Sequence, residues 1–295
     1  MRRFDPRLYQ IGALSALLIY GLTALNFDTT PLRCAIVLTA CIATQALCTW
    51  IRNNVGRASA RQLLFDPRSA AISGLSLCLL LRSNSVWLLV AGSVIAIASK
   101  FVIRWRGKHI FNPTNIAIVA LMLTTTKVWV SPGQWGNVAF FGFLITCLGG
   151  LIVNRAARSD VTYAFMIAWM SLLIGRSMWL GEPLTIPLHR MESGALLLFT
   201  FFMISDPKTT PDARAGRLLF AAIVALGGAY IQFKLFRTNG ILWSLAASAL
   251  LVPLIDALLR AERYVSNGGS SWSAASSSPL SLSSPRTPTV SAVST

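Results

Sequence analysis

Short polar clusters interrupt the apolar runs of this chain, and they are where its chemistry is expected. In the first, a basic stretch runs into Asn112-Pro113. Asn is a good N-cap and Pro fits the first helical turn, so Asn112 is predicted to begin a helix. The free N–H groups of such an N-terminus attract anions such as a phosphate or an electron-rich flavin ring. Ordinary helix capping explains the same residues without a ligand.

A second cluster brackets an apolar run that begins after Ser193-Gly194 and ends at Asp206-Pro207. The small residues at its start permit close helix approach. Pro207 breaks the helix beside the carboxylate of Asp206, which is a candidate cation ligand. An Asx-type turn at the membrane surface is the alternative interpretation of Asp206.

A third candidate is Asp256, near the end of the last apolar run. Acidic residues within membrane spans are functional candidates by default, so Asp256 and Asp206 are both candidates for an ion pathway. Arg260 stands four residues on, at the spacing of a helical ion pair. Pro253 is expected to kink this helix.

The remaining residue types argue against a hydrolytic or metal-centred enzyme. The chain has no Walker-type loop, HExxH, GxSxG or dinucleotide fingerprint, and its two histidines lie in separate loops. Three of the five cysteines, Cys34, Cys41 and Cys48, repeat every seven residues. One such step spans about 10 Å of helix, too far for one disulfide or one metal ion, so no metal site is expected.

The elements that position these residues are membrane helices. The 295-residue chain is 54% hydrophobic and only 12% charged, whereas soluble domains carry about 25% charged residues. Its net charge of +16 lies in short loops between apolar runs. Membrane proteins carry such an excess of Lys and Arg in their cytoplasmic loops, so the charge indicates a partner of membrane lipid and argues against a nucleic-acid partner.

Ten apolar runs divide the chain, and we expect each to be a membrane segment. They are Leu8–Phe27, Leu32–Ile51, Ala70–Leu81, Ser85–Ile103, Asn112–Thr125, Trp135–Val153, Val161–Leu180, Gly194–Ile204, Leu218–Phe233 and Ile241–Leu259. The third, fifth and eighth are short. Short runs suggest either half-helices flanked by irregular backbone or ordinary spans with polar ends.

The distribution of basic residues predicts the orientation. With the N-terminus inside, 18 of the 26 Lys and Arg residues fall in cytoplasmic loops and 6 in outer loops. This bias predicts ten crossings of the inner (plasma) membrane, a retained first helix and cytoplasmic N- and C-termini. Residues 1–264 are then one polytopic domain, and 265–295 form a Ser-rich cytoplasmic tail that is expected to be disordered.

Ten segments divide into five and five, which predicts two repeats of inverted topology, at about 8–125 and 135–260. Each repeat would contain a short polar-capped segment, at Asn112–Thr125 and Gly194–Ile204, as proteins with a site near the membrane midplane do. The expected fold class is therefore all-α integral membrane.

Taken together, these motifs resemble the NqrB/RnfD family over roughly residues 8–264. The resemblance rests on Phe111-Asn112-Pro113, on the run from Ser193 through Ser205-Asp206-Pro207-Lys208-Thr209 to Leu218, on Ser69–Leu75 and on Val252–Asp256. It implies a fold similar to urea and ammonium channels. It also implies a membrane subunit for electron transport coupled to ion transport, working with other membrane or redox subunits.

The family binds flavin, and many members carry FMN esterified to a Thr in a long loop after the fifth helix. Here only Thr126–Gln134 stands in that place. No covalent FMN is therefore expected, and noncovalent FMN or riboflavin stays open between the half-helices that begin at Asn112 and Ser193. The residues expected to bind it are Asn112, Thr114, Asn115, Ser193, Gly194, Asp206 and Thr209.

Two other functions stay open. One is a non-redox transporter or channel on the same scaffold, because a fold does not fix a function. The other is an accessory membrane protein of a natural-product pathway. The chain's length and its short loop are similar to standalone UnbU-like relatives that accompany enediyne biosynthesis. In the leading interpretation the chain is an electron-carrying subunit of an oxidoreductase, and in neither alternative is it a catalyst by itself.

Overall fold

A computed structural model describes residues 6–55, 65–131, 144 and 159–261 of the chain. One compact unit spans residues 1–262 and a second spans 263–295. The predicted tail at 265–295, and nearly all of the sixth predicted segment, Trp135–Val153, lie outside the described residues.

The first part of the described chain forms five helices and four short strands. The helices are α1 (Pro6–Thr23), α2 (Pro31–Val55), α3 (Pro67–Leu80), α4 (Val86–Val102) and α5 (Pro113–Thr124). The strands are β1 (Leu81–Ser83), β2 (Arg104–Trp105), β3 (Lys108–His109) and β4 (Val128–Val130). β1 pairs antiparallel with β4, with Leu81 opposite Val130, and β2 pairs with β3 in a hairpin between α4 and α5.

The second part is built from helices. They are α7 (Ser159–Leu180), α8 (Thr185–Met191), α9 (Gly194–Leu198), the π-helix η1 (Phe199–Met203), α10 (Arg214–Phe233), α11 (Gly240–Ala249) and α12 (Val252–Leu258). η1 continues α9 directly. The backbone N–H of Ile204 bonds the carbonyl of Phe199, five residues back, which is the bond that defines a π-turn.

Two of the short helices begin by the same local device. Asp66 caps α3 by accepting a hydrogen bond from the N–H of Arg68, and Pro67 occupies the first turn. Asn112 caps α5 by accepting from the N–H of Asn115, again with Pro next in sequence. Proline's fixed φ suits a first turn and its missing N–H costs nothing there. The N-cap predicted at Asn112 is confirmed.

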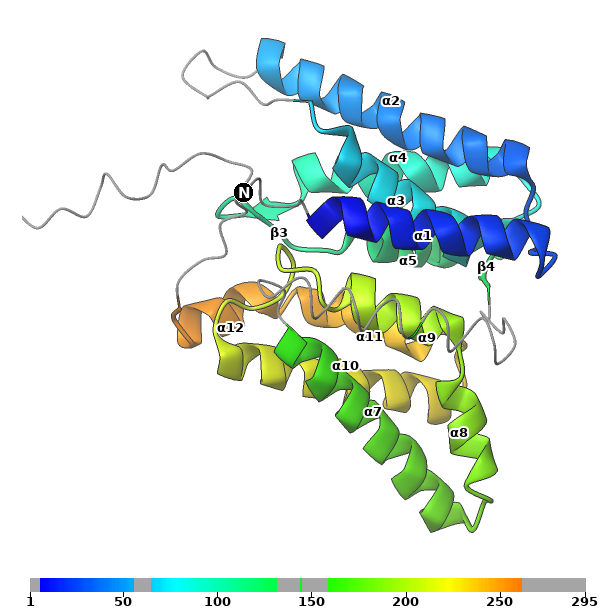
Figure 1. Cartoon of the computed structure of the whole chain (residues 1–295). Coiled ribbons are helices and arrows are strands. Elements are labelled where there is room, and N and C mark those ends of the chain that lie inside the picture. The colour runs from blue at the N-terminus through cyan, green and yellow to red at the C-terminus, as the bar shows by residue number, and fades with distance from the viewer. Residues whose placement is uncertain (1–5, 56–64, 132–143, 145–158, 262–295) are drawn as a thin grey trace, which may run out of the picture. The chain divides into compact units, whose positions relative to one another are not determined.

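The helices pack as two groups, α1–α5 and α7–α12 (Figure 1). In the first group α4 packs between α2 and α5, and in the second α10 packs between α7 and α11. Contact between α5 and α11 joins the groups. The fourth segment of each predicted repeat thus packs between the second and the fifth, which is the order that a five-segment repeat would produce. The inverted relation and the likeness to urea channels stay predictions.

The described helices suit a membrane. Three of them, α2, α7 and α10, are long and apolar enough to cross one, and α11 with α12 make a fourth candidate bent by 51° at its break. Large apolar side chains lie exposed on the outer faces, with Trp179 88% and Trp87 81% exposed. In water such surfaces would favour aggregation, whereas lipid solvates them.

The apolar runs outside the undescribed stretch coincide with helices, and the bend expected near Pro253 is confirmed. The count of ten crossings stays a prediction, because several of these helices are shorter than a full span. α8 and η1 were not expected from the sequence.

Candidate functional site

The N-terminus of α5 is tied to the second helical group by Asn112. Its side-chain Nδ2 donates to the carbonyl oxygen of Met203, the last residue of η1, at 3.4 Å. Its Oδ1 accepts the N–H of Asn115 at 3.2 Å. Thr114 and Asn115 are buried beside it, and among the described residues the Asn115 Oδ1 finds no hydrogen-bond partner. This junction holds a buried acceptor that is free to receive a bond.

Asp206 begins the polar turn that follows η1. Its carboxylate accepts the N–H of Lys208 at 3.0 Å, and its carbonyl accepts the hydroxyls of Thr209 and Thr210 at 3.2 and 3.1 Å. The Asx-type turn, which was the alternative interpretation of Asp206, is therefore present. Thr209 is buried in this turn, and its hydroxyl is bonded to the backbone.

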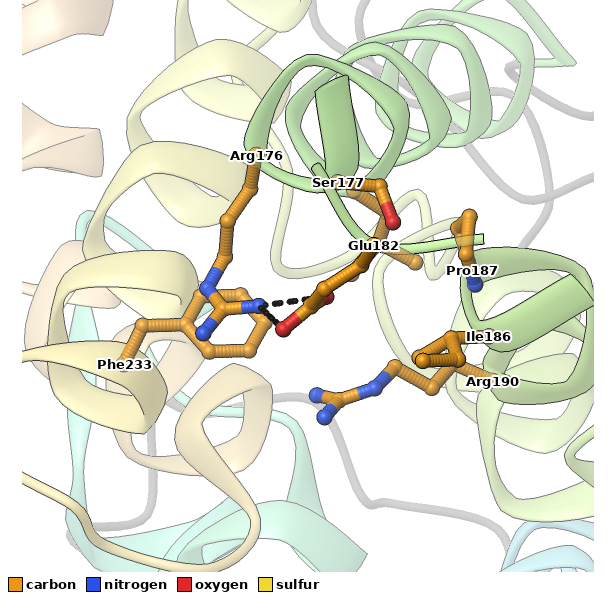
Figure 2. Close-up of a pocket in the computed structure, with 8 residues that line it drawn as sticks. Arg176, Ser177, Glu182, Ile186, Pro187, Arg190 and Phe233 are labelled. Carbon is orange, nitrogen blue, oxygen red and sulfur yellow. Dashed lines mark hydrogen bonds and ion pairs between the residues drawn. The ribbon is translucent and has the colours of Figure 1, made fainter. Parts of the chain in front are cut away.

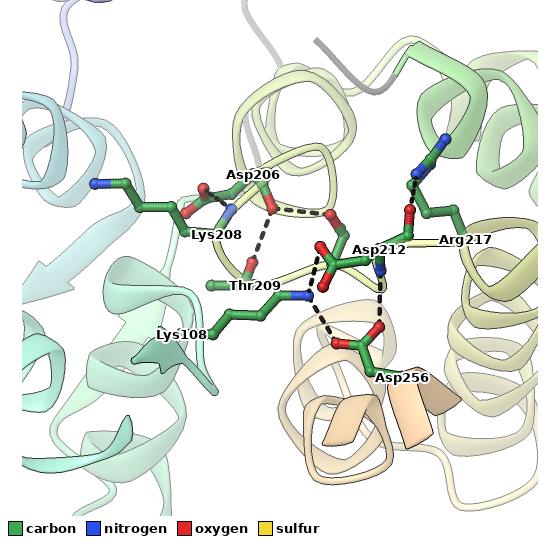
Figure 3. A network of polar contacts seen from close by, with 8 residues as sticks. Lys108, Asp206, Lys208, Thr209, Asp212, Arg217 and Asp256 are labelled. Atoms are coloured by element: carbon green, nitrogen blue, oxygen red, sulfur yellow. Dashed lines mark hydrogen bonds and ion pairs between the residues drawn. The ribbon is translucent and has the colours of Figure 1, made fainter. Parts of the chain in front are cut away.

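Lys108 bridges the two helical groups through two carboxylates (Figure 3). Its Nζ lies 2.8 Å from Oδ2 of Asp256 and 3.2 Å from Oδ1 of Asp212. The backbone N–H of Asp212 donates to the other oxygen of Asp256 at 2.7 Å. Asp256 therefore pairs with Lys108 of the β2–β3 hairpin, and among the described residues no ion pair joins it to Arg260.

Arg217 extends this network toward α7. Its guanidinium binds both carboxylate oxygens of Asp160 at 2.8 Å and donates to the carbonyl of Asp212 at 2.6 Å. Asp160, Asp212 and Arg217 were not among the site residues predicted from the sequence. One feature of the sequence could have identified them. The chain has only ten acidic residues, so each acidic residue that lies between apolar runs is expected to need a partner.

Burial shifts two further titratable groups near the hairpin toward their neutral forms. Burial, together with the nearby positive charges of Lys208, Arg104 and Lys100, lowers the pKa of His109 to about 3. Burial also lowers the pKa of Lys208 from its ordinary value, against the opposing charge of Asp206. The imidazole of His109 is thus neutral at physiological pH.

Ser193 and Gly194 lie away from this junction. The Ser193 hydroxyl accepts the N–H of Leu196 and so caps α9. α9 and η1 together run from Gly194 to Met203, which places the two ends roughly 15 Å apart. Asn112 contacts the Met203 end, so the structure does not bring the helix starts at Asn112 and Ser193 together.

A separate pocket at the end of α7 contains another ion pair (Figure 2). The Arg176 Nη1 donates to both oxygens of Glu182 at 3.1 and 3.2 Å. The guanidinium groups of Arg176 and Arg190 lie 4.5 and 5.3 Å from the ring centre of Phe233. Arg176 therefore reaches a carboxylate and an aromatic face, which accounts for a cation inside an apolar run.

The space around the Lys108 network limits what binds there. A pocket lined by Trp105, Lys108, His109, Pro253 and Asp256 has room for about one water molecule. A flavin ring does not fit this pocket or the Arg176 pocket as they stand. Within the described part of the chain, no group of three metal-ligating side chains gathers.

Comparison with known proteins identifies relatives for the second half of the chain. Residues 124–265 match the model of the NQR2, RnfD, RnfE family. A subunit of the ion-translocating oxidoreductase complex of Escherichia coli K12 is 29% identical over 136 residues, and its counterpart in Cronobacter sakazakii is 30% identical over 135. The counterpart in Citrobacter koseri is 28% identical over 133 residues. Each alignment covers 44% of this chain and 36% of the relative.

The matched part contains two of the motifs that carry the resemblance, at Ser205–Thr209 and Val252–Asp256. The chain matches about a third of the length of these relatives. For residues 8–123, including Asn112, the resemblance stays a prediction. Residues 124–265 of this multi-pass membrane chain are thus similar to the NQR2, RnfD, RnfE family.

Proposed function

We propose that this chain is an RnfD/NqrB-like membrane subunit that carries electrons in a complex coupled to ion transport. The family match over residues 124–265 carries the proposal, since the named relatives are subunits of ion-translocating oxidoreductase complexes. The charged network supports the ion-transport part. Lys108, Asp212 and Asp256 join both helical groups through partly exposed side chains, and such a network can rearrange as a cation passes.

The proposal includes a noncovalent flavin and excludes a covalent one. The nine residues from Thr126 to Gln134 replace the family's long acceptor loop, and three of them form β4, paired with β1. A noncovalent flavin would use the buried acceptor Asn115 Oδ1 beside the cap at Asn112. Since the described pockets are too small for the ring, binding it requires the two helical groups to part near the hairpin.

The direct test is an absorption and fluorescence spectrum of the full chain purified in detergent, before and after acid precipitation. Flavin released into the supernatant is the expected result. Flavin that precipitates with the chain would show that a covalent site exists. Asn115→Leu removes the free acceptor at similar size, and it should lower the flavin content. Asn54→Leu, in the exposed last turn of α2, is the matched control.

A second candidate is a non-redox transporter or channel on the same scaffold. The small size of the described pockets favours it, as does the buried Lys100 of α4. That ammonium donates to Ser69 and Ser73 and has no carboxylate partner among the described residues. Folded, pure protein without any flavin would select this candidate.

A further inference from the structure

Two cysteines from different helices lie side by side near the turn that joins α1 and α2. The Sγ of Cys78, in α3, donates to the backbone carbonyl of Cys34, in α2, at 3.7 Å. Both residues are buried, at 4% and 5% exposure. Two free, buried cysteines that meet across the α2–α3 interface are therefore candidates for a disulfide bond.

A buried cation adjoins this pair. Arg82, only 3% exposed, donates through Nη1 to the carbonyl of Cys78 at 2.7 Å. Its Nη2 has no hydrogen-bond partner among the described residues. The Thr29 hydroxyl lies 3.8 Å from the Cys34 Sγ. A guanidinium with a free N–H beside a thiol stabilises the thiolate, which is the reactive form.

We propose that Cys34 and Cys78 are a redox-active dithiol that closes reversibly to a disulfide bond. The oxidant is a compound that itself contains a disulfide. The thiolate of Cys34 attacks one sulfur of that compound and expels the other as a thiol. The thiolate of Cys78 then attacks the Cys34 sulfur and expels the second thiol. Two protons and two electrons leave the cysteines, and the oxidant is reduced to two thiols.

Arg82 makes the disulfide easy to reduce. In the dithiol state its free N–H can bond a thiolate, whereas a disulfide carries no charge and leaves that buried donor unpaired. Stabilising the reduced form raises the reduction potential. Cys34 lies one helical turn inside the exposed residues Pro31 and Leu32, so fraying of the first turn of α2 admits a small reagent.

The test uses the full chain in detergent, equilibrated in glutathione buffers that range from reducing to oxidising. Free thiols are then blocked with N-ethylmaleimide, and the digest is analysed by mass spectrometry. We expect a Cys34–Cys78 peptide pair lighter by two hydrogens, whose fraction rises and falls with the buffer. Cys34→Ser should abolish it. Cys48→Ser, which changes a half-buried cysteine on the same helix, should leave it unchanged.

A second variant tests the role of the cation. Arg82→Gln should raise the ratio of disulfide to dithiol at a fixed buffer by about tenfold, because a charge-assisted bond to the thiolate is lost. The proposal is overturned if no linked peptide forms in the most oxidising buffer. It is equally overturned if the link, once formed, does not reopen in the reducing buffers, or if Cys78 pairs with Cys41 instead.

Discussion

At the scale of single residues, Lys108 is notable because it pairs with two carboxylates at once. One ammonium serves the carboxylates of Asp212 and Asp256, whose side chains are 8% and 22% exposed. Removing the cation would leave two negative charges facing each other with little water between them. Such loss of one partner costs more than the net value of the ion pair.

Lys108→Met should therefore destabilise the protein by roughly 1–3 kcal/mol, less than a fully buried site would lose because the group is partly solvated. The measurement is the apparent melting temperature in detergent. Lys127→Met removes the same charge from an exposed loop position and serves as the control. Equal melting temperatures for the two variants would contradict a structural role for the bridge.

The lowered pKa of His109 makes the folding stability of the protein depend on pH, and it fixes the sign of that dependence. Its pKa falls from an ordinary value of 6.5 to about 3 in the folded chain, so between these values the unfolded chain binds the extra proton. Stability from this group is present above pH 6.5 and is lost as the pH falls toward 3. As the pH falls through this range, the melting temperature of His109→Gln should fall less than that of the unmodified chain.

The control for this titration is His189→Gln, because His189 is the other histidine and its side chain is 70% exposed. Carboxylates also titrate in this range, but they do so in both variants. An identical pH profile for His109→Gln and the unmodified chain would refute the buried neutral imidazole.

At the scale of elements, the close approach of α10 and α11 depends on glycine. A Cβ on Gly240 would clash with the backbone carbonyl of Gly228 and lie 3.0 Å from Gln232. The backbone cannot swing away as a flexible side chain can. Small residues at such crossings allow membrane helices to pack closely without a hydrophobic driving force.

Gly240→Ala should accordingly lower the melting temperature and broaden the size-exclusion peak. Gly175→Ala is the matched control, since a Cβ there meets nothing within 4 Å and alanine is the better helix former. If the two alanine variants behave alike, the α10–α11 crossing is not as tight as described.

Apolar runs and caps were readable from the sequence at this scale, and short or distant features were not. The Asn112-Pro113 and Asp206-Pro207 pairs mark a helix start and a helix end through local bonds, so the sequence alone reveals them. The residues of η1 are as apolar as those of an α-helix, so the sequence does not distinguish the π-turn from a regular helix. The Lys108–Asp256 pair joins residues 148 apart, and no helical spacing encodes such a partner.

At the scale of the whole molecule, the charge bias predicts which ends face the cytoplasm. Thr30 lies exposed in the α1–α2 turn, and Trp105 lies exposed in the β2–β3 hairpin. With the N-terminus inside, the turn faces outward and the hairpin inward. The two positions test the orientation of the same helical group.

In a cysteine-free background, Thr30→Cys should react with a membrane-impermeant maleimide on intact cells. Trp105→Cys should react only after the cells are permeabilised. The reverse labelling pattern would invert the orientation, and labelling of both positions on intact cells would break the predicted alternation.

The π-turn at η1 has a consequence that concerns chain length. A π-turn holds one residue more than the same stretch of α-helix. Deleting one residue of Phe199–Met203 would let α9 continue as regular α-helix, while the residues before and after the turn kept nearly their present orientation. In a regular α-helix, by contrast, the loss of one residue turns every later residue by about 100°. The bond from Asn112 to the carbonyl at the end of η1 should therefore survive the loss of one amino acid here.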